Sequence, residues 1–212
     1  MKKTIIILAA SMAAVNAQSI VNVTNTALGS ELAILDNAGV PVASGVSVVV
    51  GTFDDPSNAS DPSSFGTSFT TFGEAAFVPF SAVGGPANGF FDLGVTGLSL
   101  VAGESGNDFL TESVSVILFT GTSLSDPAGQ FAAFNTDGVF LADSVTNSAS
   151  SAAISLANLE FGQPATGDFV IDNGFLGTTT VTNGVILQAV PEPSSALLAG
   201  LALVGGLVRR RR

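Results

Sequence analysis

Oxygen-bearing side chains are concentrated in one short stretch of the first third of the chain. Three carboxylates and an amide fall within the eight residues Asp54-Asp55-Pro56-Ser57-Asn58-Ala59-Ser60-Asp61. Calcium binds about six to eight oxygen ligands of these types. The spacing differs from that of an EF-hand, so other loops would have to complete the coordination shell. Two interpretations stay open: a calcium site built on Asp54, Asp55 and Asp61, or a solvated acidic loop that holds no ion.

The remaining carboxylates form no recognisable catalytic motif. Sixteen of the seventeen acidic residues lie between residues 18 and 190, so some pair at the roughly 5–10 Å separation used in glycoside hydrolysis is expected by chance. Glu104, Asp108 and Glu112 fall in a loop and at a strand start, without an identifiable partner. Neighbouring Asp54 and Asp55 would point to opposite faces of an extended chain. We therefore expect that the protein is not an enzyme.

The basic residues lie only at the two ends of the chain: Lys2, Lys3, Arg209, Arg210, Arg211 and Arg212. Residues 18–190 contain no Lys, Arg, His, Cys, Trp or Tyr. This composition excludes Ser-His-Asp and Cys-His sites and Schiff-base lysines, and it removes the usual zinc ligands. Disulfides and side-chain salt bridges cannot form, and nucleic acid is excluded as a partner because phosphate binding requires cations. Apart from calcium, no cofactor is expected.

The chain ends in a stiff polar break, an uncharged apolar run and a basic cluster. Pro191 and Pro193 fix φ and lack N–H donors, so they end any preceding strand. Residues 196–208 carry no charge; as a helix they would span about 20 Å, less than the roughly 30 Å hydrocarbon core. The four arginines, Arg209 to Arg212, would form a membrane stop on the cytoplasmic side, which places the chain before Pro191 outside.

Together, Val190, Pro191, Glu192, Pro193, the apolar run and the terminal arginines resemble the PEP-CTERM sorting signal of exosortase substrates. The resemblance covers residues 190–212, about a tenth of the chain. It implies export, an inner-membrane-anchored precursor held by a short hydrophobic helix, and processing by exosortase near the Pro-Glu-Pro motif. The product would reach the cell surface or extracellular matrix of a Gram-negative-type bacterium. A tail anchor that is never cut is the alternative.

The first residues have the pattern of a secretory signal peptide. Met1-Lys2-Lys3 is a positive n-region, residues 4–14 are apolar, and Val15-Asn16-Ala17 is a small-residue cleavage box, so cleavage is expected between Ala17 and Gln18. The predicted organisation is a signal peptide (1–17), an exported domain (18–189) and a sorting signal (190–212).

The exported segment favours strands, because it is rich in Val, Ile, Phe, Thr and Gly. In residues 112–120, Val114, Val116 and Leu118 alternate with residues expected on a wetted face. Asn37-Ala38-Gly39 and Asn135-Thr136-Asp137-Gly138 predict hairpins, and Asn183-Gly184 predicts a further turn. About eight to ten such strands predict an all-β fold, an antiparallel β-sandwich with a jelly-roll-like or barrel-like closure as second choice. The signal helix and the short C-terminal hydrophobic helix would flank it.

Two functions fit these features. The first is a non-enzymatic exported protein, structural or matrix-associated, whose partners are exosortase, the inner membrane as a transient anchor, and exopolysaccharide. The alternative is an extracellular glycan-binding or calcium-dependent adhesive module. Sugar-stacking surfaces favour Trp and Tyr, which are absent, and most of the 16 Phe residues are expected in the core.

Overall fold

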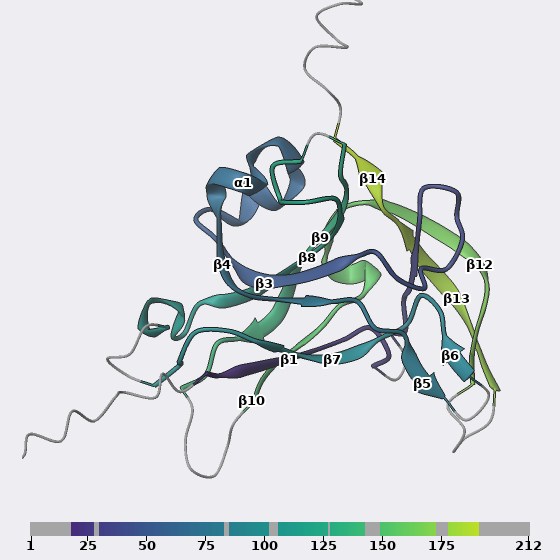
Figure 1. The fold of residues 1–212 in the computed structure, drawn as a ribbon, viewed down its shortest axis with the longest axis horizontal. Helices are drawn as coiled ribbons and strands as arrows, with labels where there is room; N and C mark the ends of the chain where they lie inside the picture. The colour runs from purple at the N-terminus through teal and green to yellow at the C-terminus, as the bar shows by residue number, and fades with distance from the viewer. Residues whose placement is uncertain are drawn as a thin grey trace, which may run out of the picture.

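The computed structural model describes residues 18–27, 30–82, 85–101, 106–126, 128–142, 149–172 and 178–190, and these are mostly β structure (Figure 1). The strands are β1 (Ile20–Thr24), β2 (Ala33–Leu35), β3 (Ser47–Phe53), β4 (Phe69–Ala76), β5 (Phe80–Ala82), β6 (Gly85–Ala87), β7 (Asp92–Thr96), β8 (Ser113–Thr120), β9 (Gln130–Val139), β10 (Ala149–Ala153), β11 (Leu159–Phe161), β12 (Gln163–Asp172), β13 (Thr178–Ile186) and β14 (Gln188–Ala189). The helical segments are η1 (Pro56–Ser60), η2 (Pro62–Ser64), α1 (Phe65–Ser68), η3 (Asn107–Phe109) and η4 (Leu156–Asn158). The predicted signal helix and C-terminal hydrophobic helix lie outside the described residues.

Within those ranges the strands form four sheets. The large sheet has the order β11-β9-β8-β3-β4, with β14 also paired to β9; the others are β10-β1-β7, β12-β13-β2 and β5-β6. Most pairs are antiparallel, as predicted, but β1–β10 and β13–β2 are parallel. The all-β prediction is confirmed, and none of the described sheets closes on itself.

The large sheet is buried on both faces. One face packs on the β10-β1-β7 sheet, where Val116 of β8 shares a cluster with Val21 of β1. On the other face, Ile117 of β8 shares a second cluster with Phe65 of α1. Figure 1 shows the large sheet between α1 above and β1, β7 and β10 below. The predicted wetted face of β8 is therefore wrong: Ser115, Ile117 and Phe119 are buried as well. Ile117 and Phe119 pack with Phe65 of α1 and Ala59 of η1, and Ser115 donates a hydrogen bond to Asn135 of β9.

The hairpin predicted at residues 135–138 is also wrong, because β9 runs through it. Ser115 pairs with Asn135 and Ser113 with Val139, so β9 holds extra residues between the two pairs, which is a β-bulge. The hydroxyl of Thr136 donates a hydrogen bond to the carbonyl oxygen of Val114 at 2.7 Å. The Thr136 side chain thus stabilises a β-bulge at the residues where a turn was predicted.

The two other turn signals had different outcomes. Gly39 has a φ of 77°, and an Asp36 carboxylate oxygen accepts hydrogen bonds from the N–H groups of Ala38 and Val40 at 2.9 Å each, so the turn at 37–39 is confirmed. Gly184, in contrast, lies inside β13, paired with Ala33 of β2.

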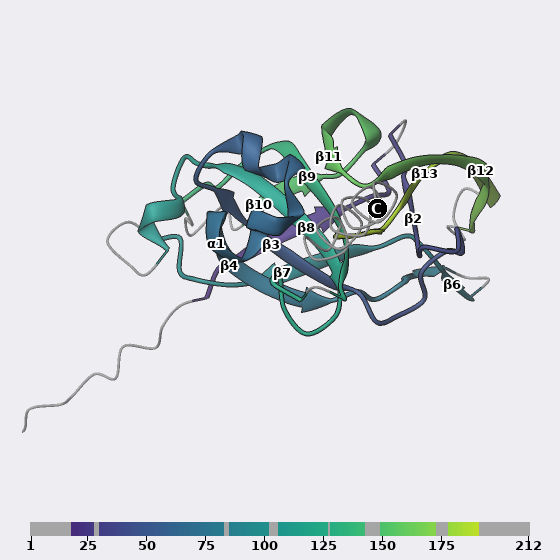
Figure 2. The same ribbon diagram turned by 90° about the horizontal axis from the view of Figure 1, so that it is seen from above.

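The β12-β13-β2 sheet brings the end of the chain back to the large sheet. Figures 1 and 2 both show β12 and β13 at the opposite end of the molecule from α1. After β13, the N–H of buried Leu187 donates to the carbonyl oxygen of Leu35 at 3.0 Å. The next two residues leave this sheet and pair with β9 as β14.

Candidate functional site

The acidic loop at residues 54–61 begins where β3 ends, and two of its carboxylates cap short helices. Asp55 accepts a hydrogen bond from the N–H of Ser57 at 2.9 Å, at the start of η1. Asp61 accepts from the N–H of Ser63 at 3.0 Å and from its hydroxyl at 2.6 Å, at the start of η2. The Ser57 N–H, with a smaller contribution from the Ser57 side chain, lowers the pKa of Asp55.

The predicted calcium ligands therefore do not act as one set. Within the described ranges, no group of three or more His, Cys, Asp or Glu side chains is placed to hold a metal ion. Asp55 and Asp61 cap two successive helices, while Asp54 faces a separate hollow. Capping explains why acidic residues precede prolines here, since Asp at the N-cap and Pro at N1 are both favoured.

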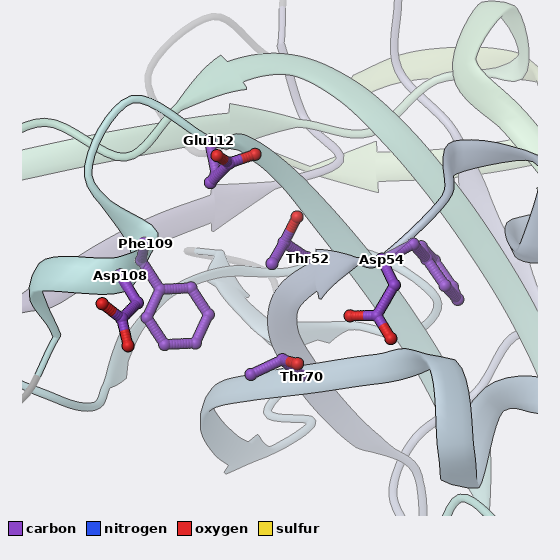
Figure 3. Close-up of a pocket in the computed structure, with 7 residues that line it drawn as sticks. Thr52, Asp54, Thr70, Asp108, Phe109 and Glu112 are labelled. Atoms are coloured by element: carbon purple, nitrogen blue, oxygen red, sulfur yellow. The ribbon is translucent and has the colours of Figure 1, made fainter.

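Asp54 lines a hollow of about 380 Å³ at the end of the large sheet (Figure 3). Its walls are Thr52, Phe53, Asp54, Thr70, Asp108, Phe109 and Glu112. Thr52 of β3 and Thr70 of β4 are direct cross-strand partners and lie in the middle of the view. The three carboxylates stand around these two hydroxyls.

Asp108 and Glu112 lie between β7 and β8 in the sequence, and local backbone geometry places both of them at the hollow. The ring of Phe109 is buried against Phe72 and Phe140, with centroids 5.6 and 5.1 Å away, and it anchors η3, which carries Asp108. Thr111 has a φ of 73°, an unusual value for a residue with a side chain. This left-handed residue turns the chain into β8 immediately after Glu112.

A second hollow, of about 190 Å³, adjoins the first and shares Thr52, Phe53, Asp54 and Glu112 with it. The remaining lining residues are Pro56, Ser113, Ser115, Asn135 and Thr136. Carboxylate and hydroxyl oxygens share both walls with apolar surface, including the Phe53 ring, and the chain supplies no basic side chain between residues 18 and 190. Chemically, the pair of hollows can accept hydrogen bonds from hydroxyl or ammonium groups.

Sequence reasoning did not bring Asp54 together with Asp108 and Glu112. No sequence pattern signals this grouping, because it depends on the strand order of the folded sheet: β3 lies between β8 and β4 and runs antiparallel to both. The end of β3 must then lie beside the start of β8. Glu104 falls outside the described residues.

Phenylalanine rings provide little exposed surface in the described part of the chain. The large apolar side chains exposed there are all aliphatic: Ile20, Val40, Val78, Leu98, Val101, Val139, Leu141 and Val170. Among the described residues, nine ring pairs lie in the core or against it, for example Phe53–Phe69 at 4.8 Å. The prediction that most phenylalanines are core residues is confirmed for this part of the chain.

The end of the described chain is held by the fold. Gln188 pairs with Phe131 and Ala189 with Gln130. Val190 is half-buried against the cluster that contains Phe65 and Phe131. The folded domain thus includes Val190.

In the sequence, the last described strand, β14, is followed by a proline-bounded apolar run and four arginines. A family model for the PEP-CTERM protein-sorting motif matches residues 189–212. The chain therefore carries this motif, which targets exported proteins to exosortase through a membrane-anchored precursor. No curated protein matches the chain. No solved structure matches it either.

The match spans the predicted processing and stop residues, of which the structure describes Val190. Pro191, Glu192, Pro193 and the four terminal arginines lie outside the described residues, as does Ala17 on the other side of the predicted signal cleavage. Gln18 is described and exposed. Among the described helices, none combines the length and the apolar character needed to cross a bilayer.

Proposed function

We propose that this chain is a non-enzymatic protein that exosortase delivers to the cell surface or exopolysaccharide matrix, where it has a structural role. The observation that carries the proposal is the PEP-CTERM match at residues 189–212. The motif supplies the route, by way of exosortase and a membrane-anchored precursor. The matrix role and the absence of catalysis are inferred from the domain that the motif follows.

The side-chain inventory of residues 18–190 supports a structural role. These residues have 16 carboxylates and no Lys, Arg, His or Cys, so covalent and general-base mechanisms that depend on those side chains have no starting point. The exposed residues of β1, β4 and β12 include Asn22, Thr70, Thr71 and Thr166. Such a hydroxyl- and amide-rich surface suits hydrogen bonding to hydrated polysaccharide.

The sorting step is tested by deleting residues 191–212 and fractionating the native host, beside the full chain in a strain without exosortase. We expect the full chain to reach the surface fraction with a mass below that of the complete polypeptide. The exosortase-deficient strain should hold the uncut form in the inner membrane. An identical location and mature mass in all three samples would remove the proposal.

Calorimetry on the exported domain separates a structural role from the glycan-binding or calcium-dependent alternative. The described residues offer mainly aliphatic exposed apolar side chains and no three-residue metal group, so this part of the chain does not favour the alternative. We expect no saturable heat on titration with calcium or matrix polysaccharide, and no rise in melting temperature with calcium beyond the rise that NaCl produces at equal ionic strength. A saturable signal in either titration would favour the adhesive module.

A further inference from the structure

The sorting motif begins inside the folded domain. Its match starts at Ala189, which is the last residue of β14. Val190, the second matched residue, packs against the cluster of Phe65 and Phe131. No spacer therefore separates the fold from the signal.

Three kinds of contact hold this junction. Strand pairing joins Gln188 and Ala189 to β9. The side-chain amide of Gln188 donates a hydrogen bond to the side-chain oxygen of Gln163 in β12 at 3.2 Å. One residue earlier, Leu187 is fully buried, and its backbone N–H donates a hydrogen bond to the carbonyl oxygen of Leu35. The backbone from 187 to 190 is thus tied to two sheets.

The sequence loses hydrogen-bond donors immediately after Val190. Pro191 and Pro193 have no N–H group, so the β14 ladder cannot continue through them. A protease needs an extended, unpaired segment, and backbone held in a ladder becomes available only through local unfolding. The backbone that the structure shows to be held by the fold therefore extends to Val190.

The sequence also places Val190 close to the apolar run that would anchor the precursor. Residues 191–195 separate Val190 from the apolar run that starts at Ala196, and five extended residues reach at most about 18 Å. The folded body cannot move farther than this from the apolar run without releasing β14. The segment open to processing is consequently short.

We propose that β14 and Val190 set the upstream limit of exosortase processing, so that the cut falls at the Val190–Pro191 bond or beyond and the mature domain keeps β14 intact. The inference rests on the proposed function. In the cut, one peptide C–N bond breaks: its carbonyl carbon takes the attacking nucleophile, water in the simplest case, and its nitrogen takes a proton and leaves with the tail.

The test is the C-terminal mass of the mature protein recovered from the native host. Gln188→Pro disrupts β14 while leaving the matched residues 189–212 unchanged. Its control is Glu160→Pro, in the exposed centre of β11, the other short strand on the same edge of β9. We expect one C-terminus at or after Val190 for the wild type and for Glu160→Pro, and additional ends upstream of Val190 for Gln188→Pro.

A second variant tests the same limit without altering β14, so the proposal remains testable if Gln188→Pro misfolds. Five Gly/Ser residues inserted between Val190 and Pro191 leave the folded domain untouched and lengthen the available segment. The new ends should lie in the insert or beyond it, with none upstream of Val190.

The outcomes separate the two proposals. A wild-type end upstream of Val190 that depends on exosortase overturns the limit set by β14 and leaves the sorting function standing. The same holds for a single unchanged end in Gln188→Pro. A mature end that is identical with and without exosortase overturns the proposed function itself.

Discussion

The side chain of Asn25 accepts a hydrogen bond from the backbone N–H of Phe91 at 2.7 Å, although 66 residues separate them. The same amide donates to the carbonyl oxygens of Leu32 at 2.6 Å and Gly89 at 2.8 Å, and Asn25 is fully buried. One side chain thus joins the end of β1, the approach to β2 and the turn before β7. Residues 18–190 contain no basic side chain and so form no side-chain salt bridges. Hydrogen bonds from a buried amide are therefore an important source of stability.

Asn25→Ala should lower the free energy of unfolding by about 3 kcal/mol, because it removes three buried hydrogen bonds and leaves their backbone partners inside the core. Urea denaturation of the purified exported protein measures the loss. Asn22→Ala, at an exposed position of the same strand, is the control and should stay within about 0.5 kcal/mol of the wild type. Equal losses for the two variants would show that the amide network contributes little.

Two glycines allow the sheets to touch backbone to backbone. Gly73 of β4 forms an isolated bridge with Gly97, just after β7. A Cβ on Gly73 would lie 2.4 Å from the Thr96 oxygen, and one on Gly97 would lie 2.3 Å from the Phe72 oxygen.

Gly73→Ala and Gly97→Ala should each destabilise the domain by about 1–3 kcal/mol, because backbone must move to admit the methyl group. Gly94→Ala is the matched control: its Cβ would meet only side-chain atoms, Cγ2 of Ile20 and Oδ1 of Asn22, and these exposed side chains move more easily than backbone. Thermal melts of the three variants measure the effect. A Gly94 variant as unstable as the other two would contradict the close approach.

Local sequence patterns predicted what depends on neighbours in the chain. Alternation at residues 112–120 located β8, and Asn37-Ala38-Gly39 located a turn, because strand periodicity and positive φ are properties of a few residues. The sorting signal was also readable, since its proline break and terminal arginines are contiguous.

The features that the sequence did not predict depend on tertiary contacts. Asn135 to Gly138 has the composition of a turn, but Ser115 and Val114 on β8 bind its side chains and hold it as a bulge within β9. The hollow that joins Asp54 to Glu112 exists only once β3 and β8 are paired. Likewise, the sequence could not show that Val190 belongs to the folded domain as well as to the signal, because its partners lie on α1 and β9.

Salt should stabilise the exported domain. Sixteen carboxylates without a compensating side-chain cation repel one another, and added NaCl screens that repulsion. We expect the melting temperature to rise with NaCl concentration at neutral pH.

Glu112→Gln should raise the low-salt melting temperature and weaken its salt dependence, because Glu112 shares a hollow with Asp54 and Asp108. Glu160→Gln, an exposed acid of β11 outside that hollow, is the control and should change both quantities less. Melting temperatures that are equal in low and high NaCl would refute the repulsion, and equal effects of the two variants would deny the hollow any special contribution.

Asp126 should give the domain a pH-dependent contribution to stability. Its carboxylate accepts hydrogen bonds from the N–H groups of Thr122 at 2.9 Å and Ala128 at 3.0 Å. These bonds, the one from Thr122 first, lower the pKa of Asp126 below its usual 3.8. A folded-state pKa below the unfolded value means that the contribution is fully present above the unfolded pKa and is lost as the pH falls through the folded one.

Asp126→Asn imitates the protonated acid, so it should be less stable than the wild type at about pH 7, and the two proteins should converge as the pH falls through the lowered pKa of Asp126. Protonation of the other carboxylates at low pH affects both proteins alike, so the difference in stability between them isolates the contribution of Asp126. Urea denaturation across the pH range measures it. A difference that stays constant down to the most acidic sample would mean that the charge on Asp126 has no part in holding the turn between β8 and β9.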